Sequence, residues 1–119
     1  MGLSVLVAED EAMMLKAIAF KLQKEGYTVQ TASDGKEAIA LLETGSFDLL
    51  VSDIMMPFAS GLELVTAIKE RGLKTKTLLL SALGQENTVL KAFSLGADDY
   101  MTKPFSPNEL LVRIKKLIG

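Results

Sequence analysis

The segment FDLLVSD at residues 47–53 decides the fold class of this chain. Residues 47–52 are almost wholly apolar, and a carboxylate, Asp53, follows at once. Short runs of this kind are typical of parallel strands, because a parallel sheet is buried on both faces. Leu3–Ala8 and Thr77–Leu80 have the same character, and they predict two further buried strands.

Amphipathic segments lie between the strands and complete an alternating pattern. Tyr27–Thr31 and Asp99–Thr102 are two further strand candidates, and apolar residues recur at helical spacing between the strands. Five strands that alternate with five helices predict an α/β fold, a three-layer sandwich in which helices cover both faces of a parallel sheet. No repeat or linker interrupts the pattern, so we expect residues 1–119 to form a single domain.

The composition narrows the chemistry that the chain can perform. The 119 residues carry a net charge of -2 and include no cysteine and no histidine. The negative charge argues against binding of nucleic acid or an anionic membrane, because both attract a basic face. Without histidine or cysteine, a reactive site must use carboxylates, hydroxyls and lysine. No apolar run approaches the length of a membrane span and no export signal is evident, so we expect a cytoplasmic location.

Polar residues at the ends of the strands carry the functional signal. The first strand runs into Glu9 and Asp10, the third into Asp53, the fourth into Ser81 and the fifth into Lys103. A single polar strand end often only meets solvent. The carboxyl ends of parallel strands, however, share one edge of the sheet, and ligands bind there. Carboxylates gathered at that edge repel one another unless a cation lies among them, and oxygen ligands alone favour Mg²⁺.

This combination of groups is suited to phosphoryl transfer. Mg²⁺ and Lys103 would neutralise charge on the phosphoryl oxygens while the Asp53 carboxylate attacks in line, since this chemistry depends mainly on positioning and electrostatics. The product would be an acyl phosphate on Asp53.

Four segments resemble one family over nearly the whole chain. They are VLVAEDE at 5–11, DLLVSDIMMPFASG at 48–61, LLLSALG at 78–84 and GADDYMTKPF at 96–105. With these motifs the chain resembles the receiver domains of bacterial response regulators, the CheY-like superfamily, and within it the OmpR/PhoB type. The resemblance implies a flavodoxin-like, doubly wound sheet of strand order 2-1-3-4-5, with the first and third strands side by side.

The resemblance also implies roles for the site residues. Asp53 would be the phosphoacceptor of a two-component system. Asp10, Asp53 and the backbone carbonyl of Met55 would bind Mg²⁺ directly, and Glu9 would reach the ion through water. Lys103 would contact the phosphoryl group.

A second group of residues would form the switch that the family uses. After phosphorylation, the Ser81 hydroxyl and Lys103 would hydrogen-bond the phosphoryl oxygens, and Tyr100 would rotate into the space that the loop after the fourth strand leaves. The peptide bond between Lys103 and Pro104 would be cis. The surface formed by the fourth helix, fifth strand and fifth helix would then change.

The implied partner is a sensor histidine kinase or a phosphotransfer protein, because a chain without histidine cannot be the phosphohistidine donor itself. The domain would be a regulatory phosphoacceptor rather than an enzyme, and would promote only its own phosphoryl transfer and autodephosphorylation.

Met55 and Leu83 are apolar where other members often carry polar groups, which predicts slow autodephosphorylation. One set of residues carries charges of both signs: Lys91, Asp98, Asp99, Glu109 and Arg113. This set resembles the dimer interface of regulators with a winged-helix DNA-binding domain, and it predicts a phosphorylation-dependent homodimer. The alternative is that these charges only form a solvated face.

Other classes share parts of this pattern. A haloacid-dehalogenase-like phosphatase also uses an aspartyl nucleophile with Mg²⁺, but it needs a second carboxylate where this chain has Met55. A nucleotide- or flavin-binding module needs a glycine-rich or hydroxyl-rich loop after the first strand, where this chain is acidic. A degenerate receiver that binds partners without phosphorylation is disfavoured, because Asp10, Asp53, Ser81 and Lys103 are all present.

Overall fold

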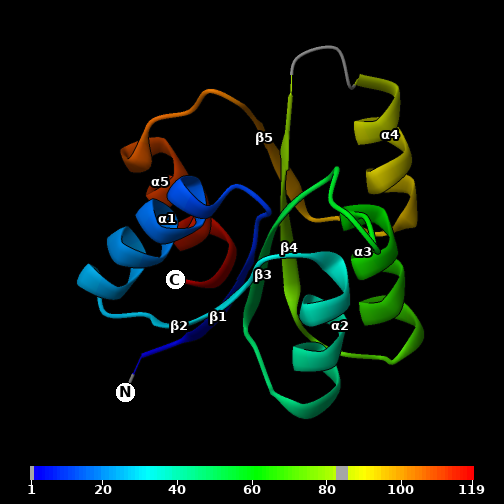
Figure 1. The fold of residues 1–119 in the computed structure, drawn as a ribbon, viewed down its shortest axis with the longest axis horizontal. Helices are drawn as coiled ribbons and strands as arrows, with labels where there is room; N and C mark the ends of the chain where they lie inside the picture. Colours follow the sequence, from blue (N-terminus) through cyan, green and yellow to red (C-terminus); the bar gives the residue numbers. More distant parts are fainter. Residues whose placement is uncertain (1, 83–85) are drawn as a thin grey trace.

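The computed structural model describes residues 2–82 and 86–119, in which strands and helices alternate (Figure 1). The strands are β1 (Ser4–Ala8), β2 (Thr28–Ala32), β3 (Leu49–Asp53), β4 (Lys76–Ser81) and β5 (Asp99–Thr102). The helices are α1 (Ala12–Lys24), α2 (Gly35–Thr44), α3 (Gly61–Glu70), α4 (Glu86–Leu95) and α5 (Pro107–Ile118). The predicted α/β fold is confirmed.

The five strands form one parallel sheet of order β2-β1-β3-β4-β5, as the resemblance implied. β1 and β3 are neighbours at its centre, with Ala8 opposite Ser52. The residues that follow these two strands therefore emerge side by side at the carboxyl edge of the sheet.

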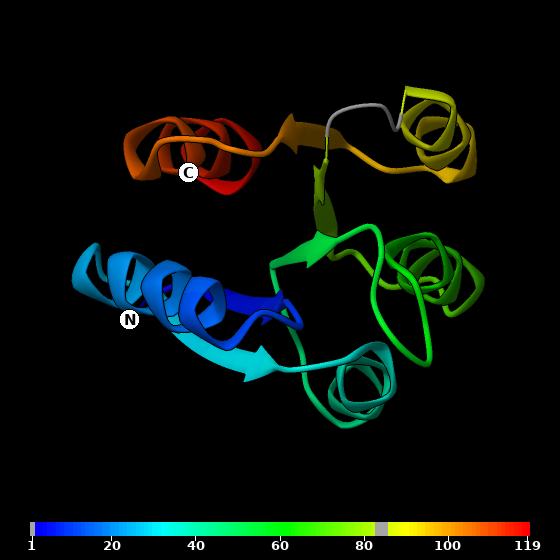
Figure 2. The ribbon, with the colours of Figure 1, turned by 45° about the horizontal axis from the view of Figure 1, so that its top comes forward.

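Helices cover both faces of the sheet. α1 and α5 lie on one face, and α2, α3 and α4 lie on the other (Figures 1 and 2). Successive side chains of a strand point to opposite faces, so Val5 and Val7 of β1 join the cluster beneath α1 and α5. Leu6 and Ala8 join the cluster beneath α2 and α3. The continuous apolar runs of the sequence are thus explained by burial on both sides.

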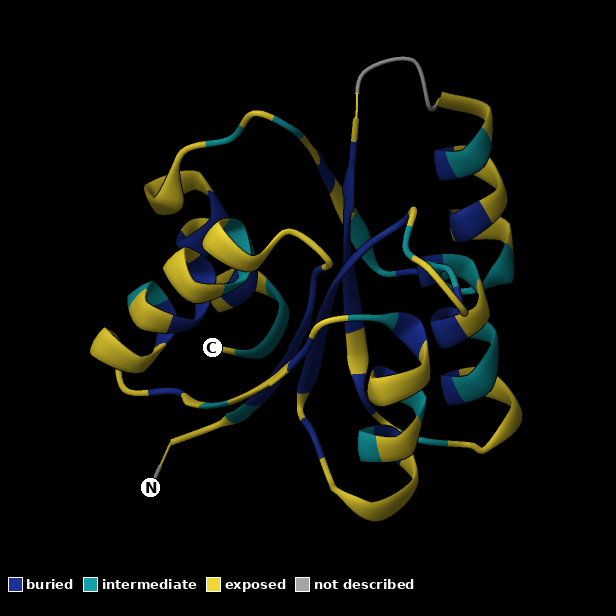
Figure 3. Ribbon diagram, viewed as in Figure 1, coloured by how far each residue is buried: buried dark blue, intermediate teal, exposed yellow. Residues whose placement is uncertain are grey.

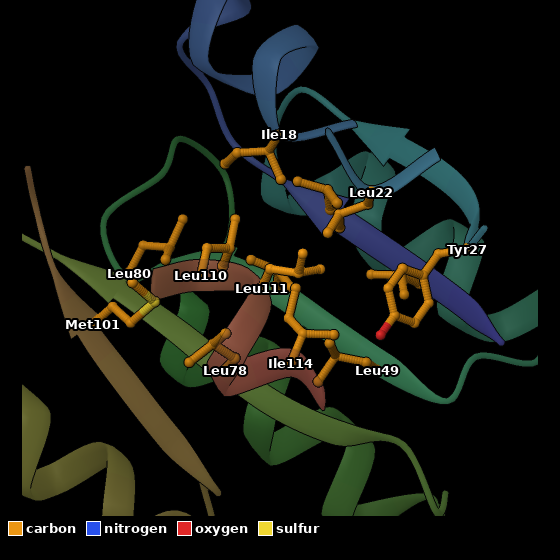
Figure 4. Packing of buried hydrophobic residues seen from close by; sticks show 13 residues of the cluster. Ile18, Leu22, Tyr27, Leu49, Leu78, Leu80, Met101, Leu110, Leu111 and Ile114 are labelled. Atoms are coloured by element: carbon orange, nitrogen blue, oxygen red, sulfur yellow. The ribbon is translucent and has the colours of Figure 1, made fainter. Parts of the chain in front are cut away.

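The core beneath α5 holds the sheet against this helix. Leu110, Leu111 and Ile114 of α5 pack with Leu49 and Leu78 of the sheet (Figure 4). The inner strands β1, β3 and β4 are buried, and exposed positions concentrate on the edge strands and the outer faces of the helices (Figure 3). Each fully buried leucine contributes about 1.5–3 kcal/mol relative to an exposed one. No helix among the described residues is long and apolar enough to cross a membrane.

The ends of the strands differ slightly from the sequence-based prediction. Tyr27 and Phe47 precede β2 and β3 instead of belonging to them, although both side chains are buried. Asp53 and Ser81 are the last residues of β3 and β4, because strand pairing continues through them. Asp53 lies opposite Leu80, and Ser81 lies opposite residue 102 of β5. Both functional candidates are therefore held by the sheet itself.

Candidate functional site

Three carboxylates meet where β1 and β3 end. One carboxylate oxygen from each of Glu9, Asp10 and Asp53 can be chosen so that all three lie within 4.8 Å of one another, a grouping that could hold a metal ion. Glu9 is fully buried, Asp53 is 8% exposed and Asp10 is exposed. An all-oxygen donor set with one exposed member suits a hard cation that keeps part of its water shell, as Mg²⁺ does. The predicted convergence of these residues is confirmed.

Lys103 joins two of the three carboxylates. Its Nζ lies 2.8 Å from Oε1 of Glu9 and 3.0 Å from Oδ2 of Asp53. The backbone N–H of Lys103 donates to the carbonyl of Ser81 at 2.7 Å, which ties this loop to the end of β4. The peptide bond between Lys103 and Pro104 is cis, as predicted. When all three carboxylates are ionised, one ammonium balances one of them, so two negative charges are left for a divalent cation to neutralise.

The ionisation of Glu9 and Lys103 reflects this crowding. Burial raises the pKa of Glu9 from 4.5 to about 7, and the neighbouring Asp53 adds to the rise while the hydrogen bond from Lys103 opposes it. Burial alone would lower the pKa of Lys103, but its hydrogen bonds to Glu9 and Asp53 outweigh burial and raise it. Lys103 therefore stays charged at neutral pH, whereas the buried Glu9 is held between its two protonation states.

Comparison with known proteins identifies the family. A profile of the response regulator receiver domain matches residues 5–115. The chain belongs to the response regulator receiver family. This receiver domain is 40% identical over 118 residues to the alkaline phosphatase synthesis transcriptional regulatory protein PhoP of Bacillus subtilis. The match covers 99% of this chain and 49% of PhoP. It thus spans about half the length of that curated relative. Two-component systems use such domains as regulatory phosphoacceptors.

Solved structures agree with this assignment. The receiver domain of the Francisella response regulator 1452 is 36% identical, has a TM-score of 0.91, and the match covers 98% of this chain and 97% of that one. DrrB of Thermotoga maritima, described as an OmpR/PhoB homolog, is 40% identical with a TM-score of 0.86, covering 98% of this chain and 52% of DrrB. The flavodoxin-like fold and the OmpR/PhoB type of this receiver domain are confirmed.

The predicted switch residues lie around one cavity. Ser81 and Tyr100 both line a space of about 330 Å³ between β4, α4 and β5. The buried Ser81 hydroxyl donates to the carbonyl of Met101 at a long 3.5 Å. The Tyr100 ring is 37% exposed and meets the ring of Phe93 edge to face, with centroids 5.7 Å apart. Open space therefore separates the hydroxyl at the sheet edge from the aromatic ring near the surface.

The residues predicted to tune dephosphorylation are only partly placed. Met55 lies in the loop between β3 and α3, two residues after Asp53, and is 59% exposed. Leu83 lies outside the described residues. Coordination of a metal ion by the Met55 carbonyl stays a prediction.

Most charged side chains of the predicted output face form ion pairs or hydrogen bonds with other residues of this chain. Arg113 of α5 lies 3.1 Å from Asp99 and 3.5 Å from Glu109, and it also donates to the carbonyl of Tyr100. Asp98 accepts hydrogen bonds from the backbone N–H and hydroxyl of Thr77, so its carboxylate ties β5 to the start of β4. Lys91 of α4, the remaining residue of the predicted output face, lines a separate surface groove near α3.

Sequence reasoning missed the backbone conformation of Phe58, in the loop that connects β3 to α3. Its φ angle of 72° is the only positive value at a non-glycine position in residues 2–82 and 86–119. Pro57 and Gly61 mark a turn in the sequence, but nothing local indicates that the left-handed position falls on the aromatic residue between them.

Proposed function

We propose that Asp53 accepts a phosphoryl group from a histidine kinase or phosphotransfer protein in a Mg²⁺-dependent reaction. The contact of Lys103 with both Glu9 and Asp53, beside a three-carboxylate cluster, is the observation that supports this most directly. Glu9, Asp10 and Asp53 would hold the ion, together with the Met55 carbonyl. When bound, Mg²⁺ would offset negative charge on the cluster and on the phosphoryl oxygens.

The chain's own residues would position the reaction. An oxygen of Asp53 attacks phosphorus, the bond from phosphorus to the donor's imidazole nitrogen breaks, and the imidazole keeps that electron pair. Lys103 has three N–H donors, and two of them point to Glu9 and Asp53. The third can meet a phosphoryl oxygen while Glu9 still holds the ammonium in place. The product on Asp53 is a mixed anhydride, and its hydrolysis resets the domain.

The signal would then pass along β4 and β5. The bond that the Ser81 hydroxyl makes to the Met101 carbonyl is long, at 3.5 Å, so the hydroxyl can turn from it toward a phosphoryl oxygen at little cost. Tyr100 has a cavity of about 330 Å³ beside it into which its ring can rotate. We propose that this motion changes the α4–β5–α5 face. Met55 and Leu83 would set the lifetime of the phosphorylated state through slow autodephosphorylation.

We propose that the α4–β5–α5 face controls dimerisation or an effector domain, since PhoP and related proteins are named as transcriptional regulators. Residues 1–119 would act as one receiver domain and would not touch nucleic acid themselves. Sedimentation of phosphorylated and unphosphorylated protein tests the dimer. A phosphorylated form that stays monomeric at high concentration would argue against this surface as a dimer switch.

The phosphoacceptor assignment is tested with acetyl phosphate and Mg²⁺, followed by intact mass and peptide mapping. We expect one phosphoryl adduct on Asp53, and none in Asp53→Ala or in the presence of a chelator. Asp48→Asn is a matched control on the same segment, because Asp48 accepts the backbone N–H of Ser4 at the opposite end of the sheet. An adduct that survives Asp53→Ala would overturn the assignment.

A further inference from the structure

The loop from Ile54 to Ser60 contains a turn that is unfavourable for the residue at its centre. The N–H of Ala59 donates to the carbonyl of Pro57 at 2.9 Å, which closes a three-residue turn around Phe58. Such γ-turns with positive φ are rare and strained, and a bulky side chain makes them worse. Glycine or asparagine would adopt this conformation at much lower cost.

The surrounding structure holds this turn in place. The Pro57 carbonyl also accepts the N–H of Gly35 at the start of α2, at 3.2 Å. Ala59 is 4% exposed, and a Cβ added at Gly35 would overlap its carbonyl oxygen. At the other end of the loop, the N–H of Gly61 donates to the carbonyl of Ile54 at 2.8 Å. The strained turn is therefore imposed by contacts on both sides and not by Phe58.

Phe58 gains little packing within the chain in return. Its side chain is 80% exposed, and among the exposed large apolar side chains of the described residues only Met13, at 81%, is as exposed. Met55, 59% exposed, lies in the same loop, and residues 54–62 carry no charge. Strained residues persist where the surrounding structure fixes them, and they cluster at functional sites. The loop thus presents an apolar side chain, held on a rigid turn, five residues from the phosphoacceptor.

The position of the loop beside Asp53 indicates which kind of molecule would contact Phe58. Asp53 is 8% exposed, so a protein that delivers a phosphoryl group to it must come close to the loop that follows it. The carboxylate cluster and the net charge of -2 disfavour an anionic lipid surface at this edge. We propose that Phe58 is a docking contact for the protein phosphodonor and has no part in the reaction with small-molecule donors. This inference rests on the phosphoacceptor role proposed above.

Two variants separate a docking role from a structural one. Phe58→Asn removes the ring and suits a left-handed turn, whereas Phe58→Tyr keeps the ring. We expect Phe58→Asn to raise the folding equilibrium constant about tenfold, because strain is relieved. Acetyl phosphate should phosphorylate both variants at the wild-type rate. A loss of stability in Phe58→Asn would show that the ring packs within the chain, and would overturn the proposal without any phosphodonor.

The decisive measurement uses an autophosphorylated histidine-kinase transmitter fragment, chosen because it phosphorylates the wild-type chain. We expect its transfer to Phe58→Asn to fall roughly tenfold or more, as for an aromatic contact residue, and transfer to Phe58→Tyr to stay near wild type. Val112→Asn on α5, which removes another exposed apolar side chain, is the control and should not change transfer. Wild-type transfer to Phe58→Asn would refute the inference. A failure of acetyl phosphate to modify Asp53 in wild type would refute the proposed function instead.

Discussion

Replacing the buried Glu9 with glutamine should stabilise the metal-free protein at high pH, although the change removes an ion-pair partner of Lys103. Burial raises the pKa of Glu9 from 4.5 to about 7 in the folded protein. Within that pH window the folded protein binds more protons than the unfolded chain does. Its stability therefore falls as pH rises through the window, and the loss is complete above the folded-state pKa.

The size of the effect follows from the shift. One pKa unit corresponds to about 1.4 kcal/mol, so a shift from 4.5 to about 7 sets a ceiling of about 3 kcal/mol. Glutamine keeps an Oε1 acceptor for Lys103 but cannot ionise. We expect Glu9→Gln to match wild type at low pH and to be up to about 3 kcal/mol more stable above the folded-state pKa. Mg²⁺ should narrow this difference, because the ionised Glu9 then has a cation beside it.

The assay is urea unfolding of both proteins in chelator across the window between the two pKa values and above it, repeated with Mg²⁺. The difference between variant and wild type isolates Glu9 from the other groups that titrate in this range. Glu43→Gln is the control, since Glu43 lies on the surface in an ion pair with Arg71. A difference between Glu9→Gln and wild type that stays constant with pH, or that shrinks as pH rises in chelator, would refute the reasoning.

Four further substitutions test the loops and the switch. Met55→Asn and Leu83→Glu should each shorten the life of the phosphoryl group on Asp53, followed by intact mass; unchanged decay in both would exclude a tuning role. Ser81→Ala should still be modified by acetyl phosphate but should lose the change in the Tyr100 ring signals in NMR spectra, and a retained change would remove Ser81 from the switch. Gly35→Ala should cost about 1–3 kcal/mol in urea unfolding, since its Cβ would meet backbone atoms of Ala59.

The features that sequence reasoning predicted are those that a local pattern determines. The apolar run at residues 47–52 could be assigned to a buried parallel strand because burial on both faces requires it. Once the strands were assigned in parallel, Glu9, Asp10, Asp53 and Lys103 had to emerge at one edge of the sheet. The carboxylate cluster and the lysine contacts confirm that step. Strand ends were less accurate, because pairing with a neighbour decides whether a polar residue such as Asp53 still belongs to the ladder.

The features that were missed arise where separate parts of the chain meet. Lys103 could pair with any carboxylate at the sheet edge, and the sequence alone does not say that it contacts both Glu9, at 2.8 Å, and Asp53, at 3.0 Å. Asp98 reads as an exposed charge in sequence, yet Thr77, 21 residues away, supplies two donors to its carboxylate. Phe58 is the clearest case. Its own preference opposes a left-handed backbone, and the conformation is imposed by hydrogen bonds that Pro57 and Ile54 accept from the first residues of two different helices. Because tertiary contacts override the local preference of Phe58, the sequence pattern cannot predict its conformation. The Phe58 side chain also packs against little of the chain, so binding to another protein becomes the explanation to test.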